Sequence, residues 1–187
     1  MKRGNLFVLS APSGAGKSSV LSSLIETERN ITTSVSHTTR KPRGNEKNGL
    51  DYYFISRSRF LEMVEDGEFL EFAEVFGNLY GTSKRAIAEE QEKGLDVILE
   101  IDWQGAIQLM ALDPDITSIF LLPPSLSDLE ARLQKRGQDS QESINQRLAQ
   151  AEDDIRQSEN YQHILTNSVL EETRDQLISI IKNRSKK

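Results

Sequence analysis

Short apolar runs and longer segments with helical periodicity alternate along most of this chain. Four runs of mostly apolar residues predict buried strands: Leu6–Leu9, Val97–Ile101, Ile119–Leu122 and His163–Thr166. Around them, apolar residues recur every three or four positions and predict helices: Lys17–Thr27, Ser83–Lys93, Gln104–Met110, Leu126–Arg136, Gln141–Ser158 and Leu170–Asn183. Strands that alternate with helices favour an α/β fold, in which helices cover both faces of a parallel sheet.

Residues 34–82 interrupt this alternation. They contain short β-like runs separated by Pro and Gly, and one short helical segment, Arg57–Asp66, that ends at Gly67. Such runs are typical of antiparallel strands joined by tight turns. We therefore expect a single domain over residues 1–187. Its core would be residues 1–33, 83–124 and 149–187, with an inserted, mostly antiparallel lobe of residues 34–82.

Composition narrows the classes of protein that fit this pattern. The chain has 187 residues, a net charge of −6 and no cysteine, which excludes disulfides, thiolate metal sites and cysteine nucleophiles. Its apolar runs are too short for a signal peptide or a membrane span, so we expect a cytoplasmic protein without a membrane partner. The overall negative charge argues against nucleic acid as a partner. Residues 36–59 are nevertheless basic, with six Lys and Arg against two Asp and Glu, as a small phosphorylated ligand requires.

A candidate phosphate-binding loop follows the first predicted strand. It leads into the first predicted helix and consists of Ala11, Pro12, Ser13, Gly14, Ala15, Gly16, Lys17, Ser18 and Ser19. Glycines let backbone N–H groups surround phosphates, Lys17 directs a charge at the β- and γ-phosphates, and the Ser18 hydroxyl is placed to bind Mg²⁺. Ala11 replaces the first glycine of the usual pattern, which a small residue can do where φ is negative. The alternative is an ordinary Gly/Ser turn, which the order of strand, loop and helix disfavours.

Arginines gather on the two helices predicted after residue 125. Arg132 and Arg136 are one helical turn apart, and Arg147 lies on the next helix, beyond a polar linker. Two helices joined in this way suit a small lid, residues 125–148, that closes over a triphosphate. The spacing alone fits solvated surface arginines better than a lid, since arginines at helical spacing are common.

The lobe offers side chains that suit a nucleotide acceptor. Arg40 and Arg43 can each bind phosphate oxygens through two N–H groups, and Tyr52 and Tyr80 can add hydroxyl donors. Glu71 lies in an otherwise apolar stretch. A carboxylate there can accept hydrogen bonds from both N1–H and the amino group of guanine, a donor pair that adenine lacks. The alternative for Glu71 is an outward-facing residue on an edge strand.

Two carboxylates close the predicted strand Val97–Ile101. Glu100 and Asp102 flank Ile101, and the two-residue period of a strand puts both on one face. The carboxyl end of a parallel strand is where α/β proteins bind their ligands. These side chains can therefore hold Mg²⁺, directly or through water, or orient the acceptor. The alternative is a strand that runs out into a polar loop.

In these motifs the chain resembles the guanylate kinases, the enzymes that move the γ-phosphoryl group of ATP to GMP. The resemblance follows the order of the chain over nearly its whole length. The segments that carry it are residues 10–19, 34–43, 49–54, 69–71, 77–82, 99–105, 123–125, 132–137 and 142–147. The segment 34–43, which reads Ser-Val-Ser-His-Thr-Thr-Arg-Lys-Pro-Arg, is far more specific than the phosphate loop.

The resemblance implies a P-loop fold of three layers with a central parallel sheet, a GMP-binding lobe and a small mobile lid. ATP would be held by the loop Ala11–Ser19 together with Arg132 and, by a weaker correspondence, Asn167. The residues implied to bind GMP are Ser36, Arg40, Arg43, Tyr52, Glu71, Tyr80, Thr82 and Asp102. The residues implied in catalysis are Lys17, Arg40, Arg136 and Arg147. Mg²⁺ is the implied cofactor, held near Ser18 and Glu100.

By this resemblance the chain would phosphorylate GMP, and dGMP, within purine nucleotide metabolism. The attacking group would already be an anionic phosphate oxygen, so no protein base is required. Two alternatives stay open: a catalytically inactive protein-binding module of the same fold, and a kinase for another nucleoside monophosphate. Intact Lys17 and Arg40 argue for an enzyme, and Ser36 and Glu71 favour guanine. The sequence does not decide whether the protein forms a homo-oligomer.

Overall fold

A computed structural model describes residues 2–136 and 140–185 of the chain. Its centre is a sheet in the order β2-β7-β1-β8-β9, in which each pair of neighbouring strands is parallel. These strands are β1 Leu6–Ser10, β2 Ile31–Thr33, β7 Asp96–Glu100, β8 Thr117–Leu122 and β9 His163–Thr166. The parallel sheet confirms the fold class that the alternating pattern predicts.

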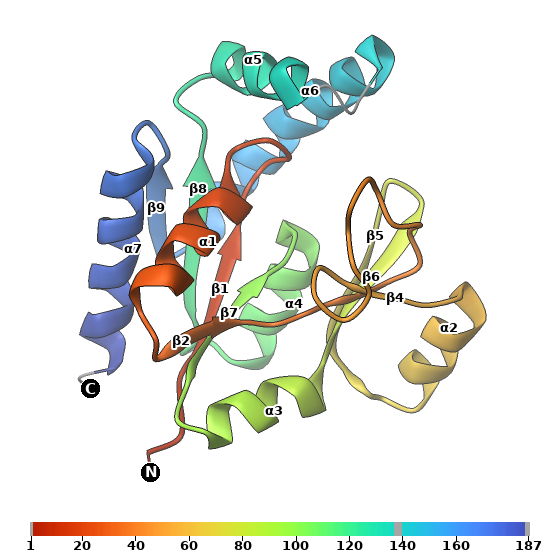
Figure 1. The fold of residues 1–187 in the computed structure, drawn as a ribbon, viewed down its shortest axis with the longest axis vertical. Coiled ribbons are helices and arrows are strands. Elements are labelled where there is room, and N and C mark those ends of the chain that lie inside the picture. The colour runs from red at the N-terminus through yellow and green to blue at the C-terminus, as the bar shows by residue number, and fades with distance from the viewer. Residues whose placement is uncertain (1, 137–139, 186–187) are drawn as a thin grey trace.

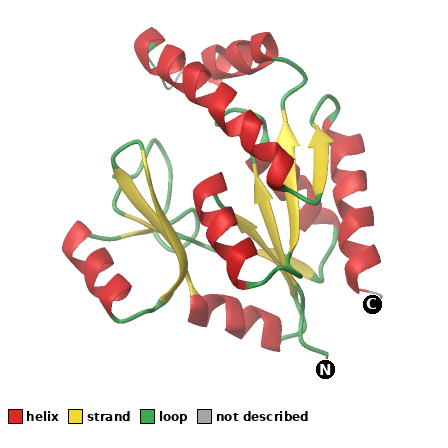
Figure 2. Ribbon diagram, turned by 180° about the vertical axis from the view of Figure 1, so that it is seen from behind, coloured by secondary structure: helices red, strands yellow, loops and turns green. Residues whose placement is uncertain are grey.

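Helices cover both faces of the central sheet. On one face lie α1 (Lys17–Thr27) and α7 (Leu170–Ser185), which stand in front of the sheet in Figure 1. On the other lie α3 (Lys84–Glu92) and α4 (Trp103–Leu112), and the view from behind in Figure 2 shows α4 in front of the sheet. The three layers agree with the predicted architecture.

Alternate residues of each central strand serve the two faces. Phe7 and Leu9 of β1 join the apolar cluster under α1 and α7, whereas Val8 between them joins the cluster under α3 and α4. The same alternation separates Ile119 from Phe120 on β8. Because a strand turns successive side chains to opposite faces, a run of continuous apolar residues is what a sheet covered on both sides requires.

Strand β2 has no counterpart among the predicted strands. It consists of Ile31, Thr32 and Thr33 and pairs with β7 at the edge of the sheet. Only Ile31 of the three is buried. All three are β-branched, which favours a strand, but three residues are too few for a periodic pattern to register.

The lobe forms a second, mixed sheet in the order β4-β3-β6-β5. Its pairs β5–β6 and β3–β6 are antiparallel, and its pair β3–β4 is parallel. The sheet packs on helix α2 through an apolar cluster that includes Phe60 and Phe69, whose rings stack 4.5 Å apart. In Figure 1 the lobe stands beside the core, on the side where α4 lies. The bounds are β3 His37–Thr38, β4 Tyr53–Phe54, α2 Arg57–Glu65, β5 Phe69–Val75 and β6 Asn78–Ser83.

The turn between β5 and β6 has an unusual residue in it. Val75 pairs with Asn78, so the loop consists of Phe76 and Gly77 alone, and both have positive φ, at 49° and 74°. Two-residue hairpin loops of this kind favour Asn-Gly, because Cβ crowds the backbone in the left-handed conformation and only glycine, or a short polar side chain such as that of asparagine, adopts it readily. Within residues 2–136 and 140–185, Phe76 is the sole residue other than glycine with positive φ.

Two helices lie above the carboxyl ends of the central strands. α5 (Leu126–Arg136) and α6 (Gln141–Arg156) pack on each other through Leu129, Leu133 and Ile144, and stand at the top of Figure 1. α6 continues without a break past residue 148, and the short helix η1 (Gln157–Asn160) links it to β9. Among the described helices, none has the length and apolar character needed to cross a membrane.

Candidate active site

The predicted phosphate loop joins β1 to the first turn of α1. Gly14 and Gly16 have φ values of 93° and 94°, which a residue with a side chain adopts only under strain. Gly16 also lies against the Asn167 amide, with no room for a Cβ. Ala11 has no positive φ, which explains why alanine can stand at that position. The loop therefore has the backbone that a phosphate-binding turn needs, and it ends at the amino end of α1, where anions are favoured.

Lys17 and Ser18 contact the end of strand β7. Lys17 Nζ donates to the carbonyl oxygen of Ile101 at 3.3 Å, and Ser18 Oγ donates to Glu100 Oε1 at 2.8 Å. Hydroxyl and carboxylate oxygens are ligands that suit Mg²⁺, and here one of each lies side by side. Among residues 2–136 and 140–185, no group of three or more His, Cys, Asp or Glu is placed so that it could hold a metal ion. The geometry thus fits a Mg²⁺ ion that shares its coordination with substrate phosphates, not one enclosed by protein.

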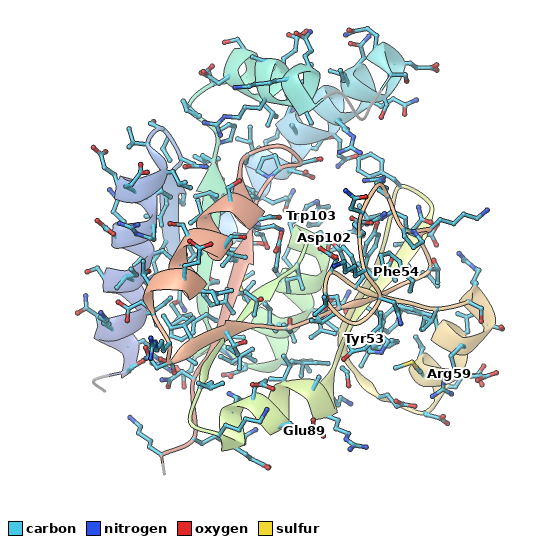
Figure 3. All side chains as sticks on the ribbon, in the orientation of Figure 1. Tyr53, Phe54, Arg59, Glu89, Asp102 and Trp103 are labelled. Carbon is cyan, nitrogen blue, oxygen red and sulfur yellow. The ribbon has the colours of Figure 1, made fainter. Side chains whose placement is uncertain are left out.

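Asp102 begins helix α4 instead of extending the strand. β7 ends at Glu100, and Asp102 Oδ1 accepts a hydrogen bond from Gly105 N at 3.0 Å as the N-cap of α4. Asp102 thus lies beyond the end of the strand and caps the next helix, which the two-residue pattern does not predict. Burial raises the pKa of Asp102, although the bond from Gly105 and the charge of Lys17 oppose this. Asp102 and Trp103 lie on the side of the core that faces the lobe (Figure 3).

Glu71 is buried between the lobe and α4. Its carboxylate is 4% exposed and accepts a hydrogen bond from Thr82 Oγ1 at 2.5 Å. Ser36 Oγ lies 3.4 Å from the same threonine hydroxyl. The other carboxylate oxygen lies where a Cβ on Gly105 would stand, so the absence of a side chain at Gly105 makes room for it. These residues are far apart in the sequence, and the fold assembles them as a buried polar cluster.

The buried carboxyl of Glu71 makes stability depend on pH. Burial raises its pKa from 4.5 to about 7, and the charge of Asp102 adds to the increase. Between these values the folded protein binds more protons than the unfolded chain, so this group's contribution to stability falls as pH rises from 4.5 to 7. We expect Glu71→Gln to increase the free energy of unfolding at pH 8 by up to roughly 3 kcal/mol, with little change at pH 4. Urea unfolding at both pH values measures this.

Glu74 supplies the control for this experiment. It lies on the same strand as Glu71 but its side chain is 53% exposed. Glu74→Gln should leave the free energy of unfolding almost unchanged at either pH. An equal gain for Glu71→Gln at pH 4 and pH 8 would contradict the proposed proton linkage.

Arg40 is held in place by an internal anion. Its two terminal nitrogens donate to the two oxygens of Glu46, both at 2.9 Å, and the guanidinium lies 5.3 Å from the ring centre of Tyr52. Burial raises the pKa of Tyr52 to about 12, and the negative charge of Glu100 adds to this effect. Tyr80 packs edge-on against Tyr52 at 6.0 Å. A bidentate carboxylate has nearly the shape of two phosphate oxygens, so the fork of Arg40 is already arranged for phosphate.

Arg43 is less engaged than Arg40. Its backbone N–H donates to Glu46 Oε2 at 2.7 Å, whereas the residue itself is exposed at the surface of the lobe. The structure thus brings Arg40, Tyr52 and Tyr80 together and leaves Arg43 beside them.

Arg132 and Asn167 support the phosphate loop from behind. Both donate to the carbonyl oxygen of Ala15, Arg132 Nη1 at 3.0 Å and Asn167 Nδ2 at 2.8 Å. Arg132 Nη2 also donates to the carbonyl oxygen of Asn167 at 2.9 Å. Two side chains predicted to contact ATP therefore also fix the shape of the loop. Arg136 is the last residue of α5, and its side chain lies outside the described part of the structure.

Arg147 connects the lid to the phosphate loop. Its Nη1 donates to Ser13 Oγ at 2.6 Å, and the residue is 8% exposed although it lies on a helix of largely exposed residues. Asp154, two turns further along α6, is also drawn inward. It accepts from Gln150 Nε2 at 3.1 Å, and burial raises its pKa.

Sequence reasoning missed Asp154 and the part played by Glu46. The available signal for Asp154 is spacing, because Arg147, Ala151 and Asp154 recur at helical intervals and so share one face of α6. From the sequence, Glu46 was only one of the two acidic residues in the basic segment 36–59. Its pairing with Arg40 depends on the turn between them, which composition does not reveal.

The turn at the amino end of α1, with Lys17 and the Ser18–Glu100 pair, has the geometry of a P-loop, which defines a class of nucleotide-binding proteins. The guanylate kinase family model matches residues 3–184. Guanylate kinases of Hahella chejuensis and Haemophilus influenzae are 48% and 49% identical to this chain, over 97% and 98% of it and 88% and 89% of their own lengths. The crystal structure of guanylate kinase from Anaplasma phagocytophilum superimposes with a TM-score of 0.82 at 37% identity, covering 100% of this chain and 89% of that one. The chain belongs to the guanylate kinase family.

Proposed function

We propose that this protein transfers the γ-phosphoryl group of ATP to GMP, yielding ADP and GDP. The observation that carries the proposal is the buried polar cluster around Glu71, whose carboxylate lies beside the hydroxyls of Ser36 and Thr82. Guanine presents N1–H and an amino group as adjacent donors, and an ionised carboxylate accepts both. Adenine, cytosine and uracil lack that pair, so the carboxylate of Glu71 favours guanine.

We propose the division into core, lobe and lid as the working parts of the enzyme. The lobe holds GMP, the phosphate loop holds ATP, and the lid brings arginines over the transferring group. GMP contacts are assigned to Ser36, Arg40, Arg43, Tyr52, Glu71, Tyr80, Thr82 and Asp102. ATP contacts are assigned to residues 11–19, Arg132 and Asn167, and the catalytic charges to Lys17, Arg40, Arg136 and Arg147.

The chemistry requires alignment and positive charge and no protein base. An oxygen of the GMP phosphate is already anionic at neutral pH, so it attacks the γ-phosphorus in line with the leaving ADP oxygen. Lys17, now bonded to a backbone carbonyl, would turn to the β- and γ-phosphates. Arg40 would exchange Glu46 for the GMP phosphate. Closure of lobe and lid excludes water, which otherwise competes as the acceptor.

A Mg²⁺ ion fits beside Ser18 and Glu100, whose oxygens lie 2.8 Å apart. When bound, it would neutralise charge on the β- and γ-phosphate oxygens. The hydroxyl and the carboxylate hold that position at the amino end of α1, where the phosphates arrive. A cytoplasmic location and the oligomeric state stay predictions.

The proposal is tested by measuring ADP release with GMP, dGMP, AMP, CMP and UMP as acceptors. We expect GMP to be the best acceptor by at least about 10²-fold in kcat/KM over AMP, CMP and UMP, because a mismatched base leaves Glu71 unpaired. Equal use of AMP and GMP would refute the guanine assignment. Absence of ADP release with every acceptor, alongside retained GMP binding, would instead favour an inactive binding module.

A further inference from the structure

Phe76 has a backbone conformation that is unfavourable for phenylalanine. It has φ of 49° in a turn where asparagine is usual, and its side chain is 55% exposed, so burial does not offset the unfavourable backbone. The carbonyl oxygen of Phe76 accepts a hydrogen bond from Asn78 Nδ2 at 3.0 Å, which ties the turn to itself. The contacts of the exposed ring therefore offer the physical reason for a phenylalanine in this left-handed turn.

The ring of Phe76 contacts the lid. The guanidinium carbon of Arg147 lies 6.0 Å from the ring centre, and Arg147 Nη1 donates to Ser13 Oγ at 2.6 Å. Through these two contacts, Arg147 joins the tip of the lobe to the phosphate loop. The three residues come from the lobe, α6 and the loop after β1, so the contact exists only when these parts are close together.

The tip of the lobe is itself held by the core. Gln108 Nε2 on α4 donates to the carbonyl oxygen of Phe72 at 2.9 Å, and Gln104 Nε2 reaches the carbonyl oxygen of Glu74 at 3.4 Å. A cavity of about 110 Å³ lies beside Phe76, lined by residues of β5, α4 and α6 that include Trp103 and Asp154. The backbone of β5 is thus held by α4, whereas Phe76 in the turn after β5 borders this cavity.

We propose that Phe76 is a positioning residue, which orients the Arg147 guanidinium for the transferring phosphoryl group through its ring. This inference rests on the proposed function. A carboxylate partner would neutralise the charge that Arg147 supplies to the phosphates. An aromatic face attracts the guanidinium through a cation–π contact, keeps its charge, and leaves its in-plane N–H groups to bond oxygens. When the lobe holds GMP, the ring of Phe76 would in this way keep the Arg147 guanidinium oriented toward the transferring group.

Four variants test the proposal with ATP and GMP as substrates. Phe76→Leu should lower kcat about 2- to 5-fold, with both KM values changed less than twofold, because the ring acts on Arg147 and not on either substrate. Phe76→Trp should retain the wild-type kcat. Phe76→Asn should raise the melting temperature by about 2–4 °C, since it suits the turn, and still lower kcat as Phe76→Leu does. The control is Phe72→Leu, an exposed ring on the adjoining strand β5, which should leave kcat unchanged.

An Arg147→Gln background isolates the contact. There Phe76→Leu should lower kcat no further, because the ring has no cation to orient. A wild-type kcat for Phe76→Leu or Phe76→Asn, or an undiminished effect in the Arg147→Gln background, would overturn the proposal. Wild-type turnover of GMP in the same assay separates the two failures: without it the proposed function fails, and with it only the role of Phe76 fails.

Discussion

Lys17→Met should reduce kcat for GMP phosphorylation by at least about 10³-fold while the protein stays folded. Lys17 lies at the start of α1, where its ammonium can reach phosphates bound in the loop, and its present partner is a single backbone oxygen at 3.3 Å. Methionine has a similar length but no charge. Phosphoryl transfer depends on positive charge fixed around the moving group, which is why the loss is large. Steady-state kinetics and circular dichroism of the variant measure both effects.

The matched control is Lys93→Met. Lys93 caps α3, is exposed, and pairs with Glu90 at 2.7 Å, away from the phosphate loop. This variant should retain the wild-type kcat. If Lys17→Met kept activity within about tenfold of wild type, the loop would not be the phosphate site, and the proposed mechanism would have to be abandoned.

Glu71→Gln should raise KM for GMP on the order of 10²-fold and leave KM for ATP within about twofold. The buried carboxylate presents two acceptor oxygens, whereas an amide presents one acceptor and one donor group. One donor of guanine would then face an NH₂ group. Because the pKa of Glu71 is raised to about 7, wild-type KM for GMP should also rise as pH falls below 7, since only the ionised form accepts both bonds. Initial rates from pH 5.5 to 8.5 measure this.

Two comparisons make the Glu71 result specific. Glu74→Gln, an exposed change on the same strand, should leave KM for GMP unchanged. The part of the pH dependence that arises from Glu71 should be absent in Glu71→Gln, so that only the titration of the GMP phosphate, whose second pKa is about 6, remains. Equal increases in KM for ATP and GMP would point to general damage of the site and count against the recognition of guanine by Glu71.

The sequence predicted the layers of the fold well but missed the strand at one edge of the sheet. Continuous apolar runs such as Val97–Ile101 identify central strands because both of their faces are buried. The sequence did not predict β2, because three residues show no periodic pattern and its pairing with β7 joins segments that are far apart in the chain. Asp102 was assigned to a strand because a local period cannot distinguish the last strand residue from a helix cap.

The candidate site was predictable as a set of residues and much less as a set of contacts. The loop around Lys17 is visible in the sequence since its residues are contiguous and their spacing reflects one backbone geometry. The bonds that Arg132 and Asn167 make to Ala15 span 117 and 152 residues, and no local pattern encodes such a meeting. Burial of Glu71 likewise depends on how tightly β5 packs against α4, which only the assembled chain decides.

Gly105 shows why stability alone is a poor guide for altering this protein. It lies in the first turn of α4, where alanine would favour the helix by about 1 kcal/mol, so a search for better helix formers would select it early. Any Cβ there would collide with the carboxylate of Glu71. The helix keeps a weak helix former at this position, and the proposed guanine site gains the space of one missing methyl group. The shape of this proposed site is set partly by an atom that is absent, which a ranking of residues by helix propensity cannot reveal.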